Sequence, residues 1–184
     1  MADYLLKNNL NIIYSVTGAG SMHFNDSIGT KKGLTVIYTH HEQAASMAAE
    51  GTARITGRPA VVNVSTGPGG TNALTGVAGA WVDSIPMLVI SGQIMRKDRG
   101  PKHGLRQMGV QEINTTSVVK NLTKYSITVE DPNTIKYHLD KAIHLAISGK
   151  PGPVWIELPL DVQSSFVNPK KLKEFKLVKN NKKI

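Results

Sequence analysis

Short apolar runs alternate with longer amphipathic segments along most of this 184-residue chain. The short runs, Met87–Ser91 among them, are mostly continuous stretches of apolar residues, without the alternation that marks a half-exposed strand. Continuous runs indicate strands that are covered on both faces, and their alternation with amphipathic segments is typical of βαβ units. The sequence therefore predicts an α/β fold in which a parallel sheet is doubly wound between two layers of helices.

The same pattern assigns the strands and helices to definite ranges. The expected strands are Ile12–Val16, Leu34–Tyr38, Ala60–Val64, Met87–Ser91, Tyr125–Val129 and Val154–Leu158. The expected helices are Asp3–Lys7, Ser21–Ile28, Gln43–Thr56, Asn72–Val82, Gln111–Val119 and Pro132–Ser148. The last of these has Asp131 as its N-cap, Pro132 in its first turn and Gly149 at its end. The segment Met95–Gly109 is expected to be a mobile loop.

Composition and charge exclude several classes of protein. The chain contains no cysteine, which excludes a disulfide scaffold, a thiolate nucleophile and a cysteine-bound metal. No run reaches the roughly 18 apolar residues of a membrane span, and no basic-then-apolar signal peptide opens the chain. Of the net charge of +9, residues 170–184 contribute +6. We expect a cytoplasmic protein whose Lys-rich tail is solvated, with no nucleic-acid partner and no membrane contact.

One long stretch of the chain is almost free of charge. Between Ala60 and Gly92, Asp83 is the single charged residue. Such a stretch is either the central core of the domain or a contact with another subunit, because an exposed apolar surface of this extent is rare on a monomer. We expect a dimer built around the helices Gln43–Thr56 and Asn72–Val82, with the central core as the alternative.

Two glycine-rich turns follow expected strands. The first is Thr17-Gly18-Ala19-Gly20-Ser21, and the second is Ser65-Thr66-Gly67-Pro68-Gly69-Gly70-Thr71-Asn72. In a doubly wound sheet, ligands bind at the carboxyl ends of the strands, where both turns lie. Glycine lets a backbone approach a ligand closely, and a helix start offers free N–H groups. Each turn taken alone could also be no more than a tight turn.

An acidic residue stands at a third strand end. Glu42 follows the strand Leu34–Tyr38 and opens a helix rich in alanine, so its carboxyl group is expected to be at least partly desolvated. A desolvated carboxyl has a raised proton affinity and can share a proton with a ligand nitrogen. The plainer interpretation is a glutamate that interacts with the helix dipole. The residues alone leave both open.

Other motifs fit less well. No HExxH zinc motif, P-loop or G-x-S-x-G nucleophile elbow is present. A dinucleotide fingerprint is the main rival, because Gly18 and Gly20 follow a strand and Glu42 stands about 20 residues further on. However, His23 occupies the third glycine position, and the second glycine-rich turn would have no role in such a site.

The run from His41 to Gln93, HEQAASMAAEGTARITGRPAVVNVSTGPGGTNALTGVAGAWVDSIPMLVISGQ, resembles a known domain. It is similar to the N-terminal pyrimidine-binding domain of thiamine-diphosphate-dependent enzymes, of the acetohydroxyacid (acetolactate) synthase-like branch. Weaker similarity continues through Gln111-Glu112-Ile113 to Leu158-Pro159-Leu160-Asp161-Val162-Gln163. The resemblance implies a three-layer α/β/α sandwich with a six-stranded parallel sheet over residues 1–166. Residues 167–184 would be a tail or the start of an interdomain linker.

The resemblance also implies roles for individual residues. In this family a glutamate at the position of Glu42 hydrogen-bonds N1′ of the cofactor's aminopyrimidine and promotes loss of the thiazolium C2 proton. Gln111 falls where the family places a glutamine near the reacting centre. The other expected cofactor-binding residues are Gly18 and Ala19 in the first turn and Thr66, Pro68 and Asn72 in the second. No metal ligand is expected within the chain.

The chain also departs from the family pattern. The family holds the diphosphate and Mg²⁺ in a separate C-terminal domain, through a GDG motif followed by Asn, and this chain has no such motif. Val110 and Leu160 stand where acetohydroxyacid synthases carry Phe and Lys in the substrate pocket. The resemblance therefore implies half of an active site for a 2-oxoacid, completed by a missing domain or partner subunit in a homodimer or tetramer. Two other functions stay open, a non-catalytic association module of the same fold and a Rossmann-type nucleotide-binding oxidoreductase. Binding of FAD by the full enzyme also stays open.

Overall fold

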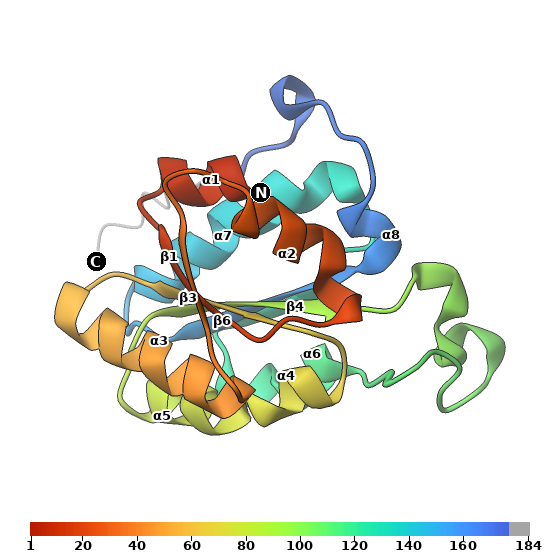
Figure 1. The fold of residues 1–184 in the computed structure, drawn as a ribbon, viewed down its shortest axis with the longest axis horizontal. Coiled ribbons are helices and arrows are strands. Elements are labelled where there is room, and N and C mark those ends of the chain that lie inside the picture. Colours follow the sequence, from red (N-terminus) through yellow and green to blue (C-terminus); the bar gives the residue numbers. More distant parts are fainter. Residues whose placement is uncertain (177–184) are drawn as a thin grey trace, which may run out of the picture.

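The computed structural model describes residues 1–176, and its centre is a sheet of six parallel strands (Figure 1). The strands are β1 (Ile12–Ser15), β2 (Thr35–Tyr38), β3 (Ala60–Val64), β4 (Met87–Gln93), β5 (Tyr125–Thr128) and β6 (Pro153–Pro159). Their order across the sheet is β2-β1-β3-β4-β6-β5. All six expected strands are confirmed, as is the parallel sheet.

The helices form one layer on each face of this sheet. In Figure 1, α1 (Ala2–Lys7), α2 (Met22–Gly29), α7 (Ile135–Ile147) and α8 (Leu160–Gln163) lie above it. Below it lie α3 (Glu42–Thr56), α4 (Pro68–Asn72), α5 (Leu74–Val82) and α6 (Thr115–Val118). The predicted three-layer α/β/α sandwich is therefore confirmed.

Each helical layer closes its own hydrophobic core against the sheet. The upper core packs large residues of α1, α2 and α7, such as Leu5 and Leu139, against Ile13 and Ile156 of the strands. The lower core is different, because α3 contributes small residues such as Ala49. Small residues let α3 and α5 lie close to the sheet and to each other.

Two of the expected helices differ in the structure. The range Gln111–Val119 is wrong as a helix, since only Thr115–Val118 is helical and Asn114 caps it by accepting from Ser117 N at 3.2 Å. The range Asn72–Val82 is divided at Ala73 into α4 and α5, and α4 begins earlier, at Pro68. Proline at a first helical position accounts for this earlier start.

Asp131 takes the expected N-cap position, but on the 3-10 turn that leads into the last long helix and not on the helix itself. Asp131 accepts from Asn133 N at 2.9 Å, although residues 132–134 form a 3-10 turn before α7 begins. Gly149 follows the helix with φ +57°, in the left-handed region that suits a glycine after a helix end.

The charge-free stretch has two environments. Strands β3 and β4, which make up much of it, are buried along their whole length, as the central-core alternative expects. On α5, by contrast, Trp81 is 39% exposed and Val82 is 73% exposed. Among residues 1–176, no helix is both long enough and apolar enough to cross a membrane.

Part of the Lys-rich tail packs back on the domain. Lys136 of α7 donates to Glu174 at 2.9 Å, and the ring of Phe175 lies 5.6 Å from that of Tyr137. The tail is thus in contact with α7 as far as these residues. Its last part, 177–184, lies outside the described residues.

Candidate functional site

The two glycine-rich turns meet where β1 and β3 end, at the carboxyl edge of the sheet. The backbone N–H of Gly20 donates to Ser65 Oγ at 3.2 Å. A Cβ at Gly18 would overlap the Ser65 side chain, and a Cβ at Gly20 would overlap Thr66 Oγ1. Glycine is therefore needed at both positions because protein atoms fill the adjacent space. This reason differs from the close approach of a ligand that the sequence suggested.

The carboxylate of Glu42 lies beside the second turn. Glu42 is the first residue of α3 and is partly buried, and the His41 ring caps the helix by accepting from Gln43 N at 3.1 Å. Glu42 Oε2 accepts from Nδ2 of Asn72 at 3.0 Å. Within residues 1–176, Oε1 has no hydrogen-bond partner, and it lies 3.4 Å from the place of a Cβ on Gly69. One oxygen is thus held and the other is free to accept.

Polar side chains support the first turn from three elements. Asn63 of β3 donates to Asn25 Oδ1 at 2.6 Å, and Asn25 of α2 donates in turn to the Gly18 carbonyl at 3.3 Å. Gln163 of α8 donates to the Gly20 carbonyl at 2.7 Å. The sequence alone assigns no role to these side chains. They hold the turn's carbonyl groups in place, so β3, α2 and α8 together set its shape.

Gln111 reaches the second turn from another direction. Its backbone has φ +58°, an uncommon conformation for a residue other than glycine. Its carbonyl oxygen occupies the place that a Cβ on Gly67 would take. Gln111 and Pro68 also line one open pocket of about 490 Å³. The other residues lining this pocket are Arg106, Gln107, Glu112, Ile113 and Asn114.

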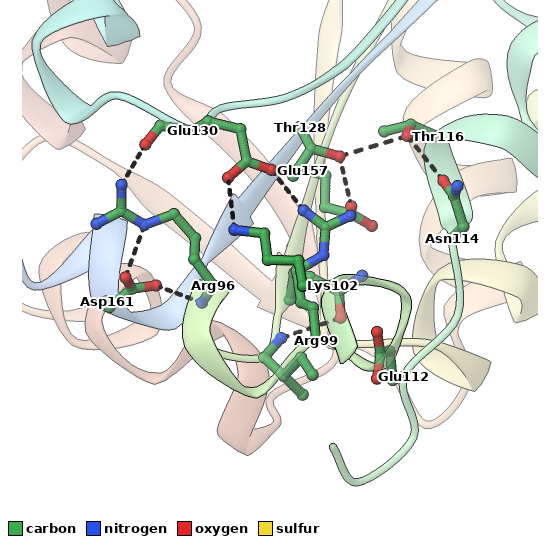
Figure 2. Close-up of polar contacts among 12 residues, drawn as sticks. Arg96, Arg99, Lys102, Glu112, Asn114, Thr116, Thr128, Glu130, Glu157 and Asp161 are labelled. Carbon is green, nitrogen blue, oxygen red and sulfur yellow. Dashed lines mark hydrogen bonds and ion pairs between the residues drawn. The ribbon is translucent and has the colours of Figure 1, made fainter. Parts of the chain in front are cut away.

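The segment expected to be a mobile loop is tied to its surroundings. It contains the 3-10 turns Arg96–Asp98 and Gly100–His103. Figure 2 shows Arg96 reaching Asp161 of α8, with Nε 2.7 Å from Oδ2, while Arg99 and Lys102 reach Glu130.

The contacts of Asp161 also set its charge state. Burial alone would raise the pKa of Asp161, but the backbone N–H and the guanidinium of Arg96 outweigh it and hold the pKa below its ordinary value. This carboxylate therefore stays ionised and anchors the loop at neutral pH.

A buried carboxyl group lies beneath the loop. Glu157 of β6 has no exposed surface. Its Oε2 accepts from Thr128 Oγ1 at 2.8 Å, whereas Oε1 has no partner within residues 1–176 (Figure 2). Burial raises the pKa of Glu157, and the hydroxyl of Thr128 offsets only part of this effect.

The expected site residues all lie around this edge, but in different environments. Glu42 and Asn72 are in direct contact, and Gln111 contacts the second turn at Gly67. Ala19 is exposed on the first turn, whereas Thr66 is only 4% exposed and its hydroxyl has no partner in the described part of the chain. In the described residues the side chains of Ala19 and Thr66 thus make no hydrogen bond, although the Thr66 carbonyl accepts from Gly69 N at 3.2 Å.

Comparison with protein families identifies the kind of domain to which this candidate site belongs. Residues 1–118 match the family model described as the N-terminal TPP-binding domain of thiamine pyrophosphate enzymes. The chain belongs to this family. The resemblance read from the Glu42 and Ser65–Gly70 blocks is thereby confirmed for the domain.

Curated relatives of this TPP-binding domain are acetolactate synthases. The chain is 37% identical over 173 residues to the acetolactate synthase large subunit of Buchnera aphidicola from Schizaphis graminum. The aligned residues cover 91% of this chain and 29% of that protein. The large subunit from Lactococcus lactis is 38% identical over 83% of the chain, and the chloroplastic enzyme of Arabidopsis thaliana is 31% identical over 92%. The chain spans 26% and 24% of these two proteins.

Proposed function

We propose that this chain is the pyrimidine-binding half of a thiamine-diphosphate-dependent enzyme that acts on a small 2-oxoacid. The observation that carries the proposal is the Glu42 carboxylate, held by Asn72 through one oxygen at the carboxyl edge of the sheet. The reaction would be a carboligation of the acetolactate synthase kind or a decarboxylation. This function rests on family membership together with that geometry.

The residues at this edge fit the aminopyrimidine ring of the cofactor. An ionised carboxylate accepts a strong, charge-assisted hydrogen bond from a protonated ring nitrogen, and Glu42 Oε1 is unpartnered in the described chain. Gly69 has no side chain to cover that oxygen. The buried hydroxyl of Thr66, also unpartnered there, offers a further polar group between the two turns.

The chemistry divides between the cofactor and the protein. Bound at this edge, thiamine diphosphate would supply carbanion chemistry toward the carbonyl group of a 2-oxoacid. The task of Glu42 is to hold a proton at the ring nitrogen, and Asn72 keeps the carboxylate turned toward the second turn. Gly18, Ala19, Thr66 and Pro68 border the ring in this proposal, and Gln111 faces the substrate.

The rest of the site must come from elsewhere. The chain has no GDG motif for the diphosphate and Mg²⁺, and it spans less than a third of its curated relatives. We assign that role to a further domain, on the same polypeptide or on a partner subunit, in a homodimer or tetramer. A cytoplasmic location belongs to the same proposal.

Titration calorimetry with thiamine diphosphate and Mg²⁺ tests this division. The chain alone should show no micromolar affinity and no turnover, because the anchor for the cofactor's most charged group is missing. Adding a polypeptide that carries the diphosphate-binding domain should restore both. Micromolar affinity of the chain alone would contradict the claim that it holds only half of the site.

A further inference from the structure

The carboxylate of Glu112 binds the backbone of its own loop. Both of its oxygens accept from the N–H of Gly100 at 3.0 Å. Oε2 also accepts from the N–H of Met108 at 2.9 Å and from that of Gly109 at 3.2 Å. Gly100 lies just before the segment 101–107, and Met108 and Gly109 lie just after it. One side chain therefore joins the two ends of the segment 101–107.

The charge state of Glu112 suits this role. Burial by itself would raise the pKa of Glu112, but the three backbone N–H groups and the nearby Arg99 guanidinium outweigh it and hold the pKa below its ordinary value. The carboxylate is thus ionised at neutral pH, which is the form that accepts from several N–H groups at once.

The residue next to Glu112 is the one that faces the proposed substrate. Gln111 has a left-handed backbone with φ +58°, and its carbonyl group lies against Gly67. A residue other than glycine stays in this conformation only where the surrounding structure fixes it. The contact with Gly67 fixes one side of Gln111, and the bonds of Glu112 fix the other.

We propose that Glu112 is a positioning residue, which closes the loop through Gly100, Met108 and Gly109 and so holds Gln111 against Gly67 at the mouth of the pocket. The part of this inference that concerns catalysis rests on the proposed function of Gln111. The loop closure itself rests only on the hydrogen bonds of Glu112.

Backbone amide hydrogen exchange of this chain tests the loop closure. Replacing Glu112→Ala removes every acceptor, so exchange at Gly100, Met108 and Gly109 should accelerate by about tenfold or more. Glu112→Gln keeps one acceptor oxygen and should give a smaller acceleration. The matched control is Glu130→Gln, because Glu130 binds the same loop through Arg99 but accepts none of these N–H groups. Unchanged exchange at all three amides in Glu112→Ala would overturn the proposal.

A double-mutant cycle in the complete enzyme tests the link to Gln111. If Glu112 acts through Gln111, Gln111→Ala with Glu112→Ala should have a kcat/KM within about twofold of Gln111→Ala alone. If the double variant instead lost kcat/KM by the product of the two single-variant losses, the two residues would act independently and the proposal would be overturned.

A second readout separates this inference from the proposed function. Exchange of the cofactor C2 proton, which we assign to Glu42, should keep its rate in Glu112→Ala. An equal loss of C2 exchange in Glu112→Ala and Glu42→Gln would overturn the positioning role. Normal C2 exchange in Glu42→Gln would instead contradict the proposed function, without changing the expected amide exchange.

Discussion

The side-chain amide of Asn72 donates to Oε2 of Glu42 at 3.0 Å, and this contact joins the end of α4 to the start of α3. The two residues are 30 positions apart in the sequence and follow different strands, β3 and β2. Because the strands are parallel, their carboxyl ends lie at one edge, and the two side chains meet there. The contact orients the carboxylate.

Replacing Asn72→Asp should destabilise the chain in a pH-dependent way. The change exchanges a hydrogen bond for repulsion between two carboxylates, at a cost of about 1–2 kcal/mol at pH 7. The repulsion ends once the pH falls below about 4, where carboxylic acids protonate. Urea unfolding at pH 7 and pH 3.5 measures this difference. Asn72→Ala, which only loses the hydrogen bond, is the control, and an equal pH dependence in both variants would contradict the assigned contact.

Alanine at Gly20 should have the opposite effect to alanine at Gly51. A Cβ at Gly20 would overlap Thr66 Oγ1, so Gly20→Ala should cost about 1–3 kcal/mol of the free energy of unfolding. Gly51 lies in the exposed middle of α3 with no atom within 4 Å of a Cβ, so Gly51→Ala should stabilise by about 0.5–1 kcal/mol. Thermal unfolding of both variants compares them directly. A stable Gly20→Ala variant would show that the two turns are not packed as described.

Glu157→Gln should stabilise the domain at neutral pH. Because burial raises the pKa of Glu157 in the folded state, folding at neutral pH must bind a proton or bury a charge. Its contribution is fully favourable below the pKa of an unfolded glutamate, about 4.3, and is lost as the pH rises through the folded pKa. In urea unfolding between pH 4 and pH 8, the free energy of unfolding of Glu157→Gln should exceed that of the wild type by about 1–3 kcal/mol, and only toward high pH. Parallel pH profiles would contradict this.

The outer surface of α3 and α5 should mediate self-association. Met47 is 44% exposed, Ile55 is 88% exposed and Val82 is 73% exposed, so apolar side chains of both helices reach the surface. We expect a dimer in light scattering, and Met47→Lys should shift it toward monomer. A wild-type monomer at high concentration would contradict this surface as an interface.

The sequence predicted the centre of the sheet well because β3, β4 and β6 are buried along their whole length and are marked by their apolar composition, whereas the edge strand β2 is largely exposed. It also placed Glu42 and Asn72 at the carboxyl edge, because Glu42 follows β2 and the glycine-rich turn that leads to Asn72 follows β3. It failed around Gln111, where a tertiary contact with Gly67 replaces the expected helix. Glu112 was missed because its partners are backbone N–H groups, which leave no pattern of side chains. An acidic residue after a basic, glycine-containing loop was the one signal available.

The contacts of Gln163 and Asp161 were also beyond prediction, because their partners lie far away in the sequence. Both lie in α8, a short helix that follows the last strand, and they bind segments more than 60 positions earlier in the chain. Local patterns carry no information on such pairs. The position of α8 depends on the order of strands β4 and β6 in the sheet.

The most direct test of the account is hydrogen–deuterium exchange at the cofactor C2 position in the complete enzyme with Glu42→Gln. Glutamine keeps the size of Glu42 and one acceptor oxygen but removes the carboxylate that holds a proton at the ring nitrogen. The account predicts a modest loss of cofactor affinity and a loss of exchange rate on the order of 10²–10⁴-fold. A glutamate that only interacts with the helix dipole would cost about 0.3–1 kcal/mol of stability and leave exchange intact. Exchange at the wild-type rate in Glu42→Gln would contradict the assignment of Glu42 to catalysis.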